Sequence, residues 1–187
     1  MIQLLGCGAF LFQKDGIPAM DKGRILIWGI GCTLLSDQGF GVSVVHDLDR
    51  LYDFDETVEL IDGGLVGVSA MGLMSGADHL IAVDAVRNNG APGDFYRWEG
   101  RRIFERFNGK NHIQQVAFLE ALAHCQLLEH PPRTVLLAIE PDNTERLDCQ
   151  LTPCLEAGKQ AMMDCILTEL DRLGVAYRKK EALQTCA

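Results

Sequence analysis

Short apolar segments typical of buried strands alternate along the chain with segments whose apolar residues recur at helical spacing. Val44, Val45 and Leu48 give this helical spacing after the turn "SDQG", and Gly or Asp closes several of the apolar runs. The predicted strands are "RILIWGIG" (24–31), "TVELIDGG" (57–64), "DHLIAVDAV" (78–86), "DFYRW" (94–98) and "RTVLLAIE" (133–140). The predicted helices are the segment after Gly39, "VSAMGLM" (68–74), "IQQVAFLEALAHCQLLE" (113–129) and "LTPCLEAGKQAMMDCILTELDRLG" (151–174).

This alternation predicts an α/β fold. Strands that follow one another through helices form a mostly parallel sheet with right-handed crossovers. At 187 residues the chain is long enough for a single domain with a full core. We therefore expect one α/β domain over 23–175, with a twisted, mostly parallel sheet flanked by helices on both faces. Residues 1–22 are expected to be an N-terminal extension, and 176–187 a polar, loosely held C-terminal tail.

Charge and cysteine usage exclude several classes of protein. The chain has 26 acidic against 17 basic residues and a net charge of -9, so no nucleic-acid partner is expected. Its apolar runs are too short to cross a bilayer, so no membrane partner is expected either. The seven cysteines are odd in number and form no C-x-x-C pair. A disulfide framework or structural zinc site is therefore not indicated, and the cytoplasm is the expected compartment.

Polar residues gather where three predicted strands end. The turn "SDQGFGV" (36–42) follows the first strand, Asp62 ends the second, and Asp84 lies near the end of the third. Parallel sheets bind ligands at the carboxyl ends of their strands, and these residues are expected at that edge. His112 lies in the "NGKNH" loop before a predicted helix, from which it is able to approach the same edge.

Three interpretations of this edge are open from the residues alone. A nucleotide site is disfavoured, because "GIGCTL" lacks the third glycine of G-x-G-x-x-G. Carboxylate, amide and imidazole groups around an open position suit a divalent ion such as Zn, Ni or Fe. In the third interpretation, Asp37 caps a helix and Asp62 and Asp84 only terminate strands, since aspartate is common in turns.

A series of motifs in this order resembles the maturation endopeptidases of [NiFe] hydrogenases. The match runs from about residue 24 to about residue 173 and comprises "ILIWGIGCTLLSDQGFGVSVV", "VELIDGGLVG", "HLIAVDAV", "APG", a His before "IQQVAFLEAL", "VLLAIEP" and "LTP". The resemblance implies an α/β endopeptidase. Such enzymes remove a C-terminal extension from the hydrogenase large-subunit precursor after nickel has been inserted. The implied partner is that precursor, and the implied cofactor is a nickel ion supplied by it.

The resemblance also implies a set of residues that contact the metal. The family positions fall on Gln38, Asp84 and His112, and Gln38 differs from the acid usual in the family. An amide oxygen is able to coordinate a metal but brings no negative charge, so weaker binding of a divalent ion is expected. Asp37 or Asp62 is the expected general base. The alternative function is a non-cleaving binding protein or chaperone that recognises a nickel-containing precursor.

Overall fold

The apolar segments form one central sheet. A computed structural model describes residues 23–64, 70–106 and 113–181. Its five-stranded sheet has the order β3-β1-β4-β6-β5, in which β5 alone runs antiparallel to its neighbour. The strands are β1 (Ile25–Gly29), β3 (Val58–Asp62), β4 (His79–Ala85), β5 (Phe95–Glu99) and β6 (Arg133–Ile139). The prediction of a mostly parallel sheet is confirmed.

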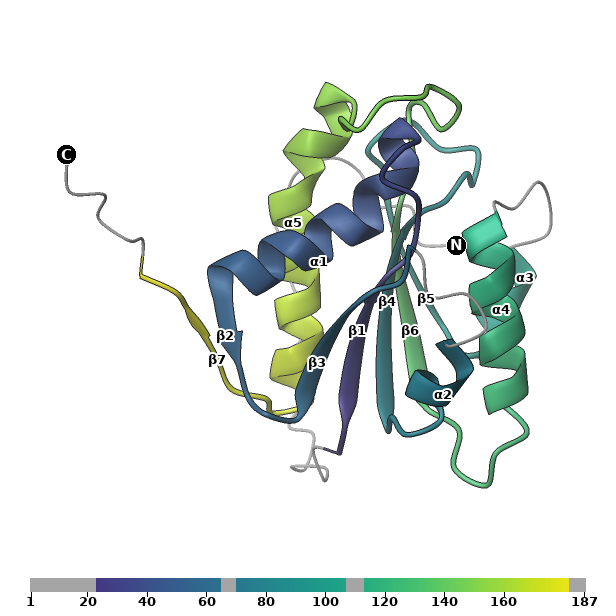
Figure 1. Ribbon diagram of the computed structural model, residues 1–187, viewed down its shortest axis with the longest axis vertical. Helices are drawn as coiled ribbons and strands as arrows, with labels where there is room; N and C mark the ends of the chain where they lie inside the picture. Colours follow the sequence, from purple (N-terminus) through teal and green to yellow (C-terminus); the bar gives the residue numbers. More distant parts are fainter. Residues whose placement is uncertain (1–22, 65–69, 107–112, 182–187) are drawn as a thin grey trace.

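Helices cover both faces of this sheet, as predicted (Figure 1). On one face, α1 (Phe40–Leu51) and α5 (Pro153–Arg172) pack on alternate strand residues such as Ile25 and Ile27. On the other face, α2 (Ala70–Met74), α3 (Arg101–Arg106) and α4 (Ile113–Cys125) cover the intervening residues, among them Leu26 and Trp28. Within the described residues, no helix is both long and apolar enough to cross a membrane.

Glycines bring the turn after β1 against the ends of the strands. The turn contains a short 3-10 helix, η1 (Ser36–Gly39), which leads directly into α1. A Cβ atom on Gly41 would lie 2.1 Å from the carbonyl oxygen of Val83, and one on Gly31 would lie 1.7 Å from that of Gln38. Gly31 also has a φ of 133°, which other residues rarely adopt. These glycines therefore let η1 rest on the carboxyl edge, where β4 ends.

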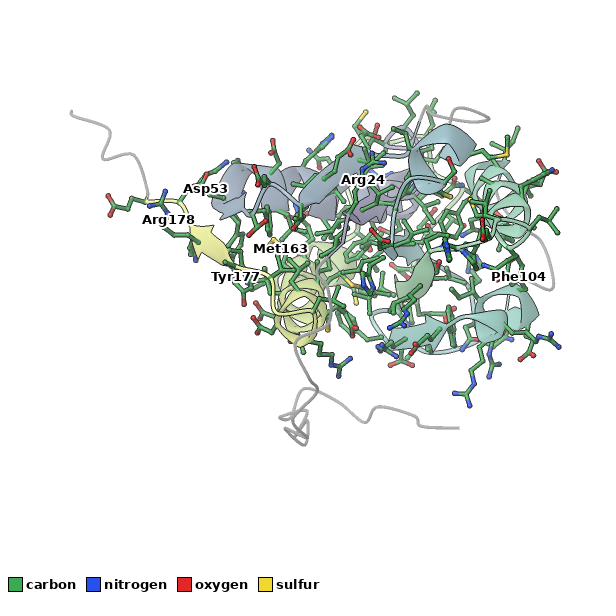
Figure 2. All side chains as sticks on the ribbon, turned by 90° about the horizontal axis from the view of Figure 1, so that it is seen from below. Arg24, Asp53, Phe104, Met163, Tyr177 and Arg178 are labelled. Carbon is green, nitrogen blue, oxygen red and sulfur yellow. The ribbon has the colours of Figure 1, made fainter. Side chains whose placement is uncertain are left out.

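The chain forms a second, two-stranded sheet that the sequence pattern did not predict. β2 (Tyr52–Phe54) pairs antiparallel with β7 (Tyr177–Lys179). The three aromatic residues of these strands have ring centroids 6.1 to 6.4 Å apart, and Arg178 donates a 3.0 Å hydrogen bond to Asp53. Figure 2 shows this pair at one end of the molecule. The expectation of a loosely held tail over 176–187 is thus wrong for residues 177–179, which aromatic packing and strand pairing hold.

Candidate active site at the carboxyl edge of the sheet

Asp37 fastens η1 to the loop between β6 and α5, hereafter the 140–152 loop. Its carboxylate is fully buried. One oxygen accepts hydrogen bonds from the backbone N–H groups of Asp142 (3.0 Å) and Asn143 (2.7 Å). Thr152 donates its N–H to the other oxygen at 2.8 Å and its hydroxyl to the first at 3.1 Å. Four donors at one buried carboxylate make Asp37 the anchor of the loop.

Gln38 contacts the same loop as a hydrogen-bond donor, whereas the Asp37 carboxylate is an acceptor. Its side chain is buried, and its Nε2 donates to the backbone carbonyl of Thr144 at 2.6 Å. A backbone carbonyl only accepts hydrogen bonds, so the amide nitrogen must face Thr144 and the amide oxygen must point away from it. The hydroxyl of Thr144, itself buried, accepts a 3.0 Å hydrogen bond from Nη2 of Arg87.

Asp84 is a buried acid at the end of β4. Its side chain accepts one hydrogen bond from the backbone N–H of Ala85 (2.8 Å) and one from Nε2 of Gln115 (2.7 Å). Burial raises the pKa of Asp84 to about 7, although the hydrogen bonds from Gln115 and Ala85 act to lower it. Near neutral pH this carboxyl group is therefore divided between its neutral and charged forms.

Gln115 places α4 beside Asp84. The same Nε2 that reaches Asp84 also donates to the carbonyl of Ala85 at 3.1 Å. Gln115 follows His112 by three residues in the sequence. His112 itself lies outside the described residues, so its participation in the site stays a prediction.

Asp62 belongs to a different hydrogen-bond set from Asp84. Strand β1 lies between β3 and β4, and the register pairs Asp62 with Gly29 and Gly29 with Val83. The backbones of β3 and β4 are therefore two strand spacings apart, which is roughly 10 Å. The exposed Asp62 carboxylate lies 3.0 Å from Nε2 of His46 on α1 and accepts the N–H of Gly64 at 2.9 Å. The carboxyl edge thus carries Asp62 and Asp84 at separate positions.

A hollow of about 420 Å³ lies beside η1. Its lining comes from the turn that contains η1, the first two turns of α1, the first turn of α5, and the 140–152 loop, and it includes Ser36, Ser43, His46, Cys149 and Gln150. His46, which contacts the exposed Asp62, is therefore part of the wall of this hollow. The lining offers both polar and apolar groups to an extended peptide.

Glu140 is a further buried acid at this edge that sequence reasoning did not single out. Its carboxylate accepts hydrogen bonds from the N–H groups of Asn88 (2.8 Å) and Gly90 (3.1 Å) and from the hydroxyl of Tyr96 (2.7 Å). Burial and the nearby Glu140 carboxylate raise the pKa of Tyr96. Glu140 thereby fixes the turn after β4. The only signal for it in the sequence was an acid as the last residue of the predicted strand 133–140.

No group of three or more His, Cys, Asp or Glu side chains suitable for a metal ion occurs within residues 23–64, 70–106 and 113–181. The predicted metal-contacting set includes one amide, Gln38, and one residue outside these ranges, His112. Of that set, the structure describes Gln38 and Asp84. Both are buried, and η1 contacts β4. These two residues supply oxygen atoms of different charge, one from an amide and one from a carboxyl group.

The fold and these side chains define a single-domain α/β protein with a polar site at the carboxyl edge of its sheet. Comparison with known proteins assigns this protein to a family. The family model described as HycI, hydrogenase maturation protease, matches residues 42–169. The chain belongs to this family, which confirms the resemblance seen in its motifs, and it is a peptide hydrolase.

Individual relatives agree with this assignment. The chain is 32% identical over 162 residues to the hydrogenase 2 maturation protease of Escherichia coli K12, covering 86% of this chain and 98% of that protein. It is 32% identical over 161 residues to the hydrogenase expression/formation protein HupD of Thiocapsa roseopersicina, covering 84% and 72%. Among solved structures, the hydrogenase maturating endopeptidase HybD from E. coli superposes with a TM-score of 0.79 at 29% identity, covering 84% and 98%.

Proposed function

We propose that this endopeptidase removes the C-terminal extension of a [NiFe] hydrogenase large-subunit precursor after nickel has been inserted. The observation that carries the proposal is Asp84, a buried carboxyl group with its pKa raised to about 7 at the ligand-binding edge of the sheet. Strongly shifted acids in such positions are typical of functional sites. Family membership supports the proteolytic step, and the relatives' names support hydrogenase maturation as its setting.

Nickel enters this proposal as part of the substrate. Asp84, Gln38 and His112 would contact the ion held by the precursor, and the ion would polarise the peptide carbonyl that is attacked. With His112 neutral and Gln38 uncharged, Asp84 is the single source of negative charge in this set. Such a set attracts a free divalent ion weakly, so it favours an ion whose other ligands come from the precursor.

Asp37 and Asp62, the two predicted catalytic acids, have different roles in this proposal. Asp37 has four donors on its carboxylate, so it holds the 140–152 loop and the backbone on which Gln38 stands. Asp62 is exposed and contacts His46 beside the hollow, so it is the acid that is accessible to a water molecule. A general base must come within hydrogen-bond reach of the water it activates.

The test is cleavage of a purified precursor in nickel-loaded and nickel-free forms, with the released extension detected by mass spectrometry. The proposal expects rapid release from the nickel-loaded form, and no release after Asp84→Ala. Equal rates for both forms would contradict nickel recognition. If neither form is cleaved, that result would contradict the proposal that this precursor is the substrate.

The presence of glutamine at position 38 favours a second candidate function, which is binding without cleavage. Since this neutral residue stands where the family usually has an acid, the chain could recognise a nickel-containing precursor without cutting it. Tight binding of the nickel-loaded precursor, measured by calorimetry, combined with no release of its extension would support this alternative over the proteolytic one.

A further inference from the structure

Arg87 is a cation at the rim of the site whose charge is not neutralised by a neighbouring acid of the described chain. It follows Asp84 by three residues, just beyond the end of β4, and its side chain is exposed. Within residues 23–64, 70–106 and 113–181, no acidic group lies within 4.0 Å of its guanidinium. Arg97 on β5, by contrast, is paired with Glu169 at 2.9 Å.

The guanidinium of Arg87 is nevertheless held in place. Its Nη2 donates to the hydroxyl of Thr144 at 3.0 Å, and Thr144 is buried. The carbonyl of the same threonine accepts the amide of Gln38 at 2.6 Å. One buried residue therefore contacts both Gln38 and Arg87, which places the cation next to the proposed metal-contacting set.

The backbone that carries Arg87 is also fixed. Glu140, which is buried, accepts the N–H of the next residue, Asn88, at 2.8 Å and that of Gly90 at 3.1 Å. A side chain that starts from a fixed turn and is tied at its tip loses little conformational freedom when it binds a ligand. Among residues 23–64, 70–106 and 113–181, Thr144 is the only hydrogen-bond partner of this guanidinium, so its remaining N–H groups are available there for a planar anion.

We propose that Arg87 is a specificity-determining residue that binds a carboxylate of the precursor's C-terminal extension. This inference rests on the proposed function. The carboxylate belongs either to an Asp or Glu side chain of the extension or to its terminal residue, because both offer the same bidentate geometry to a guanidinium. In a chain with a net charge of -9, a cation at this edge gives an acidic peptide a point of electrostatic attraction beside the site.

The test uses the full-length protein with Arg87→Gln, Arg87→Lys and Arg87→Glu. Arg101→Gln on α3 is the matched control, since Arg101 is exposed and lies outside the site. The substrates are three nickel-loaded precursors: the native form, one whose extension has every Asp and Glu changed to the amide, and one with an amidated C-terminus. Arg87→Gln should raise KM for the native form about tenfold with a smaller change in kcat, because a charge-assisted hydrogen bond is lost.

The three substrates distinguish the two sources of the carboxylate. The substrate that lacks the recognised carboxylate should show the same KM with the wild-type protein and with Arg87→Gln. If the carboxylate is that of an Asp or Glu side chain, Arg87→Glu should regain affinity for a precursor in which this residue is changed to lysine. An unchanged KM for the native form would overturn the proposal. So would an equal loss of kcat on all three substrates, since that result indicates positioning of Gln38 through Thr144.

A binding measurement separates this inference from the proposed function. Fluorescence anisotropy with labelled synthetic peptides of the extension, in free-acid, amidated and acid-to-amide forms, reports on Arg87 without cleavage. Weaker binding of the acidic peptide to Arg87→Gln would support the inference even if the wild-type protein cleaves no precursor. Equal binding of all peptides by the wild-type and Arg87→Gln proteins, or binding of none, would overturn it.

Discussion

Gln115 on α4 donates a 2.7 Å hydrogen bond to the carboxyl group of Asp84 at the end of β4. The bond joins a helix on one face of the sheet to the edge where the proposed chemistry takes place. It also opposes the effect of burial on Asp84, because a donor to the carboxylate favours the charged form. The charge state of the site near neutral pH is therefore set by two residues on different elements.

The first prediction concerns stability and pH. The pKa of Asp84 rises from 3.8 to about 7 on folding, so the folded state binds a proton that the unfolded state releases between these values. This group's contribution to the free energy of unfolding is thus fully present below pH 3.8 and is lost as pH rises to about 7. Asp84→Asn removes this dependence. As pH rises from 4 to 7, the melting temperature of the variant should increase relative to that of the wild type. Thermal unfolding at several pH values measures this difference.

Urea unfolding at pH 5 and pH 8 gives the same comparison at constant temperature. A difference between the two proteins that does not change with pH would contradict the raised pKa of Asp84.

The second prediction concerns cleavage and pH. Only the charged form of Asp84 offers nickel a full negative charge, so the cleavage rate of the nickel-loaded precursor should rise with pH up to about 7. Gln115→Leu removes a donor that lowers this pKa, so the rise should move to higher pH. The measurement is the pH profile of kcat/KM for both proteins. The idea fails if both profiles have the same midpoint while the variant is folded.

The third prediction concerns Gln38→Glu. The Thr144 carbonyl, 2.6 Å from the Gln38 amide nitrogen, requires a donor, and an ionised glutamate has none. The variant should lose about 1 to 3 kcal/mol of stability at pH 8, because a buried acceptor is left opposite another acceptor. Chemical denaturation checks this, and Gln38→Met is the uncharged control. We also expect no large gain in cleavage. A large gain at unchanged stability would mean that Gln38 impairs the native enzyme.

The fourth prediction separates the two predicted catalytic acids. Asp37→Asn should lower the free energy of unfolding by at least about 2 kcal/mol, because its amide group faces backbone donors in a buried position. Asp62→Asn should change stability by less than about 1 kcal/mol, because the Asp62 side chain is exposed. If Asp62 is the general base, Asp62→Asn should bind the precursor with normal affinity but should not cleave it. Normal cleavage by Asp62→Asn would exclude that role.

Limited proteolysis provides a second measurement on Asp37→Asn. The variant should be cut faster than the wild type within 140–152, while Asp62→Asn should keep the wild-type pattern.

The main strands and the long helices could be predicted from the sequence, because the strands contain apolar runs and the helices repeat apolar residues at helical spacing, whereas the six-residue α3 was not predicted. β4 and β6 are seven-residue strands with at least four consecutive apolar residues each, and α5 spans 20 residues and carries Pro153 in its first turn and Gly174 after its end. β2 and β7 have three residues each, which is too short for any pattern to emerge. Their pairing depends on aromatic contacts between segments far apart in the chain.

Individual residues of the site could be predicted from the sequence, but the contacts that they make could not. Asp37, Gln38 and Asp84 stand out as polar residues beside apolar strands, which is a local signal. Their partners are remote: Thr152 lies 115 residues from Asp37, and Gln115 lies 31 residues from Asp84. Whether an acid anchors a loop or faces a substrate depends on such partners, and no spacing rule within one sequence supplies them.

The anchoring of the 140–152 loop also fixes its alignment with η1. Going along the loop, two N–H donors are followed by a carbonyl acceptor, and they meet Asp37 and then Gln38 in the matching order of acceptor and donor. A shift that brings Pro141 to the place of Asp142 would remove one of these donors, because proline has no backbone N–H. The dipeptide Asp37–Gln38 therefore holds residues 142–144 of the loop against η1, and deleting one residue from the loop should displace Arg87 and Gln38 together, because both contact Thr144.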